Sequence, residues 1–193
     1  ATVYGTNTLD VFVGLGKGQA STNNNVTVNI GDSVEYIPEF LFYEDTNVKY
    51  VNISDKSQSK TIGRYAFAGT NIAEIKLPKS LTSYINNAFL NCANLANVYY
   101  LGSVNDWLLN NFESESANPM NNGVYMWFTN DSNAFERLDT LNISNIGKIG
   151  NYQFVNNTDL ITLTISNVKS VGQYAFAGCT NLTTLTLENV TSL

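Results

Sequence analysis

The sequence feature that most constrains the fold is an apolar pattern that recurs about every 22 residues. Each unit has a phenylalanine, an apolar or aromatic residue five positions before it, and three apolar residues after it at spacings of three and two. The phenylalanines are Phe42, Phe67, Phe89, Phe154 and Phe176. The triplets are Val48, Val51 and Ile53; Ile72, Ile75 and Leu77; Leu95, Val98 and Tyr100; Leu160, Leu163 and Ile165; and Leu182, Leu185 and Leu187. A further triplet has no phenylalanine in register and consists of Leu138, Leu141 and Ile143.

This periodicity predicts a solenoid, because one unit cannot bury its apolar face alone, whereas stacked units form a continuous core. The spacing of two within each triplet is typical of a β-strand and not of a helix. Each unit should therefore supply one short strand of a parallel ladder, with the last two triplet residues pointing inward. The 65 residues between Phe89 and Phe154 leave room for about two irregular units. We expect a β-rich, right-handed repeat solenoid of the leucine-rich type, with short 3₁₀ or irregular corners and little helix.

The stretch YAFAG occurs twice, at 65–69 and at 174–178. A duplicated active site and a repeated building block would both produce such a recurrence. Because the phenylalanine of each copy lies in register with the 22-residue pattern, we interpret the two copies as corners of the solenoid. Their tyrosine and phenylalanine are expected to face the core, and their glycine to permit the turn that follows.

The two best-preserved units read IGRYAFAGTNIAEIKLPKSLTS and VGQYAFAGCTNLTTLTLENVTSL. They resemble the BspA-type (Treponema-type) leucine-rich repeats, and the resemblance covers roughly residues 31–193. The segment VYYLGSVNDWLLNNFESESANPMNNGVYMWF is similar to the interrupting unit of that family, in which a Trp, an Asn-Pro-apolar turn and an extra strand replace a plain repeat. The chain departs from the family pattern locally, for example with Gln153 where the repeat has alanine.

The repeat pattern covers most of the chain but not its N-terminal part. Residues 1–25 do not fit the repeat and are interpreted as an N-terminal β cap or the end of a preceding region. Residues 26–193 are expected to form a leucine-rich repeat solenoid of about 6–7 units, with an irregular aromatic insert at about 101–137. Leu193 falls six residues after Leu187, at the first apolar position of a further corner. We therefore expect an uncapped C-terminal end, either because the chain is a fragment of a longer array or because another copy covers it.

The composition argues against several classes of function. The net charge is −6, and the 10 Lys and Arg residues are scattered, which is not the basic stripe of a nucleic-acid-binding protein. No apolar run approaches the roughly 20 residues that span a bilayer, so this segment should not insert into a membrane. The chain has no histidine, which removes the Ser-His and Cys-His nucleophile arrangements and the commonest metal ligand. We expect no enzyme activity, no cofactor and no metal site.

Three motifs could carry chemistry but have simpler interpretations. The stretch GLGKG at 14–18 lacks the remainder of a phosphate-binding motif and is interpreted as a hairpin loop. Glu113 and Glu115 lie in a polar loop and are expected to be solvated. Cys92 and Cys179 each follow a repeat phenylalanine by three residues and lie several coils apart. They should be small buried corner residues that form no disulfide with one another.

The best candidate for a binding site is the outward side of the strand ladder, because solenoids use their concave surface for partners. The positions that flank the inward residues are Tyr50, Asn52, Glu74, Lys76, Asn97, Tyr99, Thr140 and Asn142, followed by a threonine-rich end at residues 162–186. A second candidate surface is the aromatic insert, with Trp107 and Trp127, beside Tyr125 and Phe128. These aromatic side chains could instead pack the irregular coil.

These features favour a non-catalytic module. The resemblance implies an extracellular or cell-surface protein-interaction or adhesion module, because proteins of this type are bacterial and protist surface adhesins that bind host, matrix or other cell-surface proteins. One alternative is a structural spacer or self-assembling element of a larger envelope protein, acting through the open C-terminal end. A further alternative is a carbohydrate-binding accessory domain that uses the insert.

Overall fold

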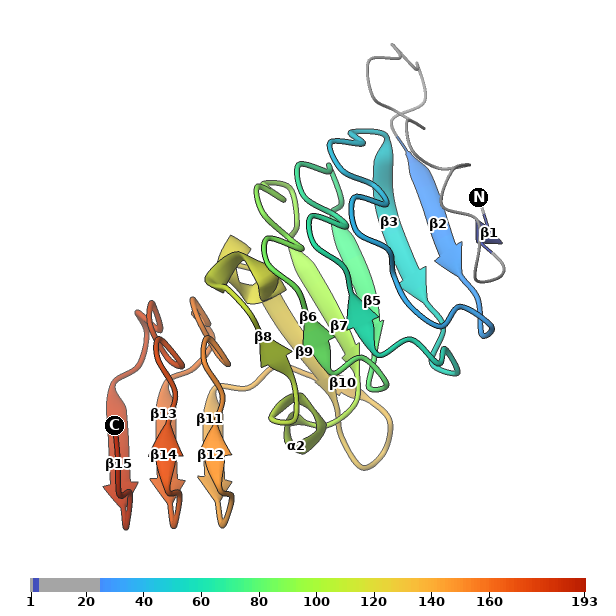
Figure 1. Ribbon diagram of the computed structural model, residues 1–193. Helices are drawn as coiled ribbons and strands as arrows, with labels where there is room; N and C mark the ends of the chain where they lie inside the picture. The colour runs from blue at the N-terminus through green and yellow to red at the C-terminus, as the bar shows by residue number, and fades with distance from the viewer. Residues whose placement is uncertain (1, 4–24) are drawn as a thin grey trace.

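The computed structural model describes residues 2–3 and 25–193, which form a β solenoid with little helix (Figure 1). The main sheet has the strand order β1-β2-β3-β5-β7-β9-β10. Neighbours from β1 to β9 are parallel, and β10 is antiparallel to β9. The strands are β1 (Thr2–Val3), β2 (Val26–Ile30), β3 (Val48–Ile53), β5 (Glu74–Pro78), β7 (Asn97–Leu101), β9 (Tyr125–Thr129) and β10 (Phe135–Glu136).

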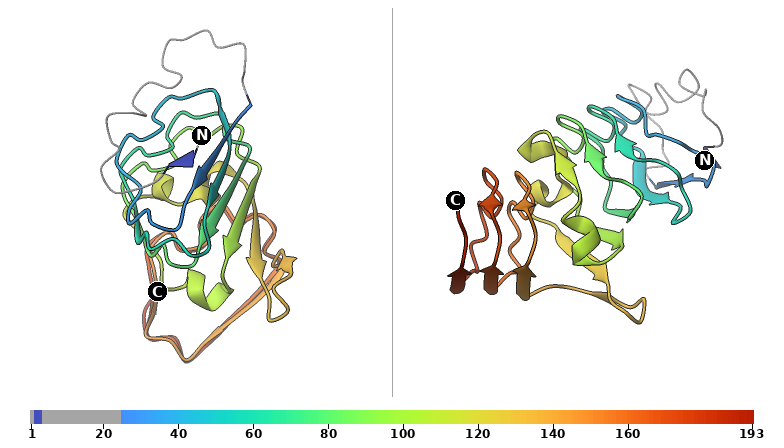
Figure 2. Two further views of the ribbon diagram at one scale, coloured as in Figure 1. Left: turned by 90° about the vertical axis from the view of Figure 1, so that its right-hand side faces the viewer. Right: turned by 60° about the horizontal axis from the view of Figure 1, so that its bottom comes forward.

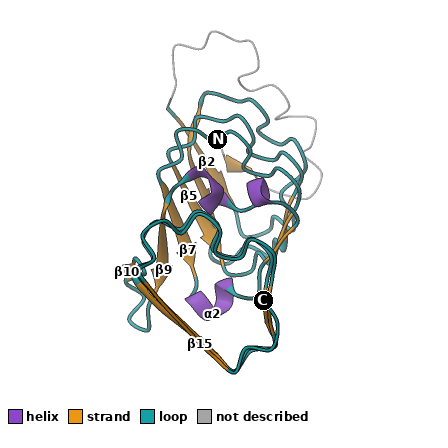
Figure 3. Ribbon diagram, turned by 90° about the vertical axis from the view of Figure 1, so that its left-hand side faces the viewer, coloured by secondary structure: helices purple, strands orange, loops and turns teal. Residues whose placement is uncertain are grey.

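A second parallel sheet follows, with the order β11-β13-β15. Its strands are β11 (Thr140–Ser144), β13 (Thr162–Ser166) and β15 (Thr184–Glu188). Two short parallel ladders form the other side of the coils (Figure 3). They are β4 (Thr61–Ile62), β6 (Ser83–Tyr84) and β8 (Asn111–Phe112), and β12 (Lys148–Ile149) and β14 (Ser170–Val171). The helical segments are α2 (Val104–Trp107), η1 (Glu115–Ala117) and η2 (Pro119–Asn122).

The predicted parallel-strand solenoid is confirmed, and the last two residues of each triplet are buried in every coil except the last. Val51 pairs with Ile75, and Ile75 pairs with Val98, so the same core row runs through three coils. The side chains of this row are at most 1% exposed. The phenylalanines form a second row inside the corners. Phe67 stacks on Phe89 with ring centroids 5.4 Å apart, and the equivalent rings Phe42, Phe154 and Phe176 also stack on a neighbour.

Left-handed backbone shapes each of these corners. The residues two positions before and two positions after a core phenylalanine have φ between 55° and 72°. They are Phe40, Tyr65, Asn87, Tyr152 and Tyr174 before it, and Glu44, Gly69, Asn91, Asn156 and Gly178 after it. The glycines of both YAFAG copies therefore occupy left-handed turn positions, as expected, because that conformation is disfavoured for residues with a Cβ.

The prediction that the YAFAG tyrosines face the core is wrong. Tyr174 is 62% exposed, and Tyr65 is partly exposed. Their left-handed backbone turns the side chain outward, where each ring stacks on the equivalent residue of the preceding coil. The ring centroids of Tyr65 and Phe40 are 5.4 Å apart, and those of Tyr174 and Tyr152 are 5.6 Å apart.

The solenoid is interrupted between the two sheets (Figure 2). The antiparallel β10 pairs with β9 at Phe128 and Thr129, and β11 then begins a separate sheet. On the other side of the coils, β8 and β12 likewise belong to different ladders. We call this region, where both ladders change, the junction.

Side chains of the insert join the coils at the junction. The indole Nε1 of Trp107 donates to the carbonyl of Gln153 at 2.9 Å, and the Gln153 amide donates to the carbonyl of Trp107 at 2.6 Å. Asn118 Nδ2 donates to the carbonyl of Tyr152 at 2.7 Å. Gln153 lies where other coils have alanine, such as Ala66, whose carbonyl accepts from the backbone of Phe42. The departure of Gln153 from the repeat is therefore explained by its contact with Trp107.

The predicted N-terminal β cap and the GLGKG loop fall mostly on residues outside the described ranges. Of the predicted cap, the structure describes strand β1, which pairs with β2. At the other end, Leu185 and Leu187 continue the rows of the buried Leu163 and Ile165. Leu185 is 55% exposed and Leu187 is 41% exposed. The interpretation that a further coil or a second copy covers these side chains stays a prediction.

Candidate functional site

The register of the main sheet arranges the predicted outward residues in two rows. The first row runs from Tyr50 through Glu74 and Asn97 to Tyr125. The second row runs from Asn52 through Lys76 and Tyr99 to Trp127, in the same strands. Six of the predicted outward residues therefore lie on one continuous strip of β surface. Trp127 is the last residue of the second row.

Thr140 and Asn142 do not continue these rows. They lie on β11, in the second sheet, where they pair with Thr162 and Thr164 of β13. The junction separates them from the main sheet, so the structure does not bring them together with the other predicted residues.

Aromatic side chains gather where the two rows end. Tyr99 stacks on Trp127, with ring centroids 5.9 Å apart, because the two residues are paired across β7 and β9. The return of the chain in β10 places the Phe135 ring edge-on to Tyr99 at 5.1 Å. Trp127 is held further by its Nε1, which donates to the Asn97 side chain at 3.0 Å. We call Tyr99, Tyr125, Trp127 and Phe135 the aromatic cluster; Tyr125 is 48% exposed and Phe135 is 38% exposed.

A tight turn positions the hairpin that carries this cluster. The Asn130 side-chain oxygen accepts hydrogen bonds from the backbone of Ser132 and Ala134, both at 3.0 Å. Asn133 has a left-handed φ of 57°, which asparagine tolerates better than most residues. The hairpin is therefore fixed by local sequence, and Phe135 is not carried on a free loop.

Arg137 connects the aromatic cluster to the second half of the solenoid. Its guanidinium carbon lies 4.0 Å from the centroid of the Tyr125 ring. Its Nε donates to Asp159 Oδ2 at 2.9 Å, and its Nη2 forms an ion pair with the other carboxylate oxygen. The hydrogen bond to Asp159 raises the pKa of Arg137 above its ordinary value. The Asp159 side chain is only 8% exposed.

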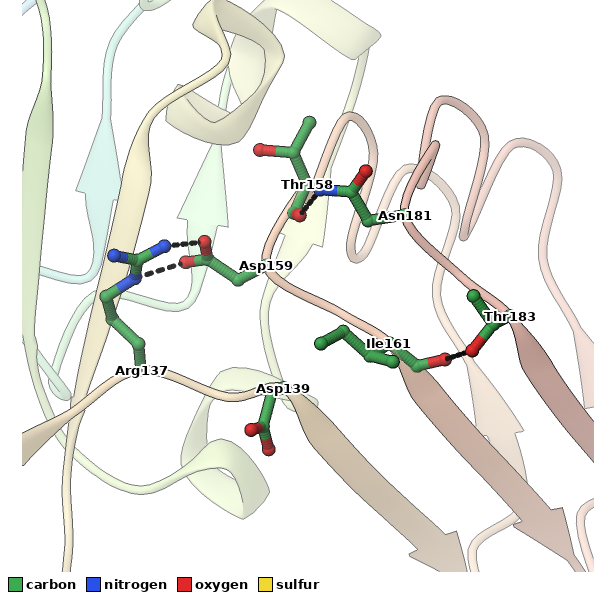
Figure 4. A pocket seen from close by; sticks show the side chains of 7 residues that line it. All are labelled: Arg137, Asp139, Thr158, Asp159, Ile161, Asn181 and Thr183. Atoms are coloured by element: carbon green, nitrogen blue, oxygen red, sulfur yellow. Dashed lines mark hydrogen bonds and ion pairs between the residues drawn. The ribbon is translucent and has the colours of Figure 1, made fainter.

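A hollow of about 620 Å³ opens beside Arg137 (Figure 4). It lies between the segment that leads into β11 and the loops that precede β13 and β15. Its lining residues are Arg137, Asp139, Thr158, Asp159, Ile161, Asn181 and Thr183. Arg137 lines the hollow and also contacts the rings of the aromatic cluster, so the hollow and the cluster form one surface at the junction, which we call the junction site.

Trp107 packs inside the irregular coil and is not part of an exposed aromatic surface. Trp107 is completely buried. Its ring packs against Tyr84 and Tyr100, with centroids 6.1 Å and 5.0 Å away. Helix α2 starts with a capping box at Ser103 and turns the indole into the core of the insert. Of the two tryptophans, only Trp127 reaches the outer surface.

The two cysteines occupy the simpler environments that the sequence indicates, and Glu113 and Glu115 are both exposed. Cys92 is buried, Cys179 is half-buried, and both are free thiols. Each thiol donates to a phenylalanine carbonyl of a neighbouring coil, Cys92 to Phe67 at 3.2 Å and Cys179 to Phe154 at 3.3 Å. Burial raises the pKa of Cys92 to about 12 and that of Cys179 to about 11. Both thiols therefore stay protonated at neutral pH, where a nucleophile would need the thiolate.

Two other kinds of site are absent from the described residues. Within residues 2–3 and 25–193, no three His, Cys, Asp or Glu side chains come together as metal ligands. None of the helices in this part of the chain has the length and hydrophobicity of a membrane span.

The sequence did not point to Phe135, Arg137, Asp139 or Asp159 as site residues. Phe135 lies outside the register of the repeat, so periodicity says nothing of its neighbours. For Arg137 and Asp159 a signal exists, because the two residues are 22 positions apart. That separation is one repeat, and residues one repeat apart lie on adjacent coils.

The sequence matches the family model for the BspA-type leucine-rich repeat region in six copies, over residues 20–122 and 128–193. No curated protein matches the chain. Solved structures similar to it include the T. pallidum leucine-rich repeat protein TpLRR, at 18% identity and a TM-score of 0.48, covering 88% of this chain and 73% of that one.

Two further solved structures are similar to the chain. The pneumococcal vaccine antigen PcpA has 19% identity and a TM-score of 0.38, over 85% of this chain and 51% of its own. A leucine-rich cell surface protein from Faecalibacterium prausnitzii has 16% identity and a TM-score of 0.30, over 83% of this chain and 60% of its own. The family model covers most of the chain, and the repeat geometry agrees with it, so this chain belongs to the BspA-type leucine-rich repeat family.

Proposed function

We propose that the chain is a non-catalytic adhesion module of a cell-surface or secreted protein, and that the outer rows of the main sheet and the junction site contact a protein partner. Leucine-rich repeat proteins generally mediate protein–protein interactions. The resemblance to surface adhesins supports the location.

The observation that carries this proposal is the aromatic cluster at the end of the two rows. Tyrosine, tryptophan and arginine are the residue types that contribute most to binding at protein interfaces. Here Tyr125, Trp127 and Arg137 lie on a hydrogen-bonded sheet and hairpin, partly exposed and already in contact with one another. A partner would therefore meet rigid aromatic side chains whose conformational entropy is already restricted.

The test is binding of the purified chain to immobilised collagen, laminin and fibronectin, and to cultured epithelial cells, by biolayer interferometry and flow cytometry. The double variant Tyr125→Ala, Trp127→Ala should bind at least about tenfold more weakly, the effect expected for loss of interface anchors. A matched control is Thr162→Ala, Thr164→Ala, which changes two outward positions of the second sheet and should alter affinity less than about twofold. Circular dichroism melts would verify that both variants fold.

Two results would contradict the proposal. One is saturable binding that the Tyr125, Trp127 variant leaves unchanged. The other is the absence of saturable binding to all three matrix proteins and to the cells.

A further inference from the structure

The junction site carries an excess of negative charge next to its aromatic rings. The Arg137 charge is already neutralised by Asp159, whose side chain is nearly buried beneath it. Asp139 is exposed, and its carboxylate makes no hydrogen bond or ion pair with any residue in the described ranges. Figure 4 shows this carboxylate pointing away from the Arg137–Asp159 pair. The two carboxylates and one guanidinium that line the hollow therefore leave one uncompensated negative charge, on Asp139.

The aromatic rings at this site are suited to a cation. The face of an aromatic ring carries negative electrostatic potential and attracts lysine and arginine side chains. Arg137 already uses this attraction, since its guanidinium lies over Tyr125 and also 5.9 Å from the Trp127 ring centroid. Arg137 therefore already makes a cation–π contact at this site. A cation of a partner would make the same kind of contact with the exposed surfaces of Tyr125 and Phe135.

The hollow has room for the rest of a long basic side chain. Ile161, which is 45% exposed, supplies an apolar surface for an alkyl stem. Thr158, Asn181 and Thr183 supply neutral oxygen atoms for the hydrogen-bond donors of an ammonium or guanidinium group. The hollow is open to solvent on one side, and its volume of about 620 Å³ is comparable with that of small-ligand clefts.

We propose that the junction site binds a basic segment of the partner protein, with a lysine or arginine side chain lying in the hollow against Asp139 and the aromatic cluster. This inference rests on the proposed function and specifies the partner's chemistry at that surface. Charge complementarity carries it, because the chain as a whole has a net charge of −6 and the site adds a local negative excess. A neutral glycan would use the rings but not the Asp139 charge.

The experiment compares three eight-residue peptides that alternate glycine with arginine, with glutamine or with glutamate. Their binding to the full chain is measured by fluorescence anisotropy at 50 and 300 mM NaCl. We expect the arginine peptide to bind at least about tenfold more tightly than the other two at low salt, and its affinity to fall at high salt as screening increases.

Two Asp→Asn variants, each of which removes one negative charge with little change in side-chain shape, separate the effect of Asp139 from that of the overall charge. Asp139→Asn should weaken the arginine peptide by at least about fivefold. Asp55→Asn changes the net charge of the chain equally but lies at an exposed position just after β3, so it should change affinity less than about twofold. Tyr125→Leu should weaken the same peptide while leaving the melting temperature close to that of the unmodified chain.

Equal effects of Asp139→Asn and Asp55→Asn would overturn the inference, and so would comparable binding of the glutamine or glutamate peptide. Binding of a neutral oligosaccharide such as cellohexaose that Tyr125→Leu abolishes and Asp139→Asn leaves intact would also overturn it, in favour of a glycan site. The proposed function is judged separately. If Asp139→Asn has no effect but the Tyr125, Trp127 variant still loses matrix-protein binding, the basic-segment inference fails and the interaction module remains.

Discussion

Replacing Phe67 by alanine is expected to lower the free energy of unfolding by about 3–5 kcal/mol, the cost of truncating a fully buried aromatic side chain. Phe67 has no exposed surface and lies in the middle of the row formed by Phe42 and Phe89. Truncation removes its contacts with both neighbouring coils and leaves a cavity that the rigid corners cannot easily close. The measurement is chemical denaturation followed by circular dichroism.

The matched control is Phe176→Ala, the equivalent position in the second YAFAG corner. Phe176 stacks on Phe154 at 5.4 Å but is only partly buried. Because less of its surface leaves water on folding, its truncation should cost distinctly less than that of Phe67. Near-normal stability of the Phe67 variant would refute its place in the core, and equal losses at the two positions would contradict the burial difference.

Trp107→Ala is expected to have a comparable effect on stability, about 3–5 kcal/mol, and a second effect on cooperativity. Trp107 packs against the aromatic rings of the insert and is hydrogen-bonded in both directions to Gln153. Since both strand ladders change at the junction, the variant should weaken the coupling between the two halves of the solenoid. We expect a single unfolding transition to broaden or divide into two.

Trp107→Phe separates packing from hydrogen bonding. It keeps an aromatic ring but removes the donor to the Gln153 carbonyl, so the expected loss is about 1–3 kcal/mol. The control is Trp127→Phe, at a partly exposed position whose indole donates to Asn97; it should cost less than Trp107→Phe. Differential scanning calorimetry is the measurement. A single sharp transition in Trp107→Ala at the normal temperature would contradict the junction described above.

The parts of the fold that follow from apolar spacing could be predicted from the sequence. Residues at spacings of three and two face inward in a strand and corner, whatever the rest of the unit contains, so Val51, Ile75 and Val98 were identified as core. Tyr65 and Tyr174 could not be placed in this way. Their left-handed φ is imposed by the corner and turns the ring outward, and a tyrosine gives no local sign of that conformation.

The candidate site could be predicted only in part, for a related reason. Register along the ladder carries Tyr99 and Asn97 to the outer face, as expected. Trp107 and Trp127 lie in an insert without the 22-residue period, so the sequence could not tell the buried ring from the exposed one. The antiparallel return of β10 and the Arg137–Asp159 pair arise where the repeat is interrupted, and they create the junction site from residues that have no shared motif.

Hydrogen–deuterium exchange would show whether the partner contacts the main sheet where it ends at the junction. The chain would be measured alone and when saturated with the matrix protein that binds it most tightly. We expect slower exchange in residues 97–101 and 125–139 on binding, with little change in residues 184–193. Protection confined to the last coil, with residues 125–139 unchanged, would contradict it.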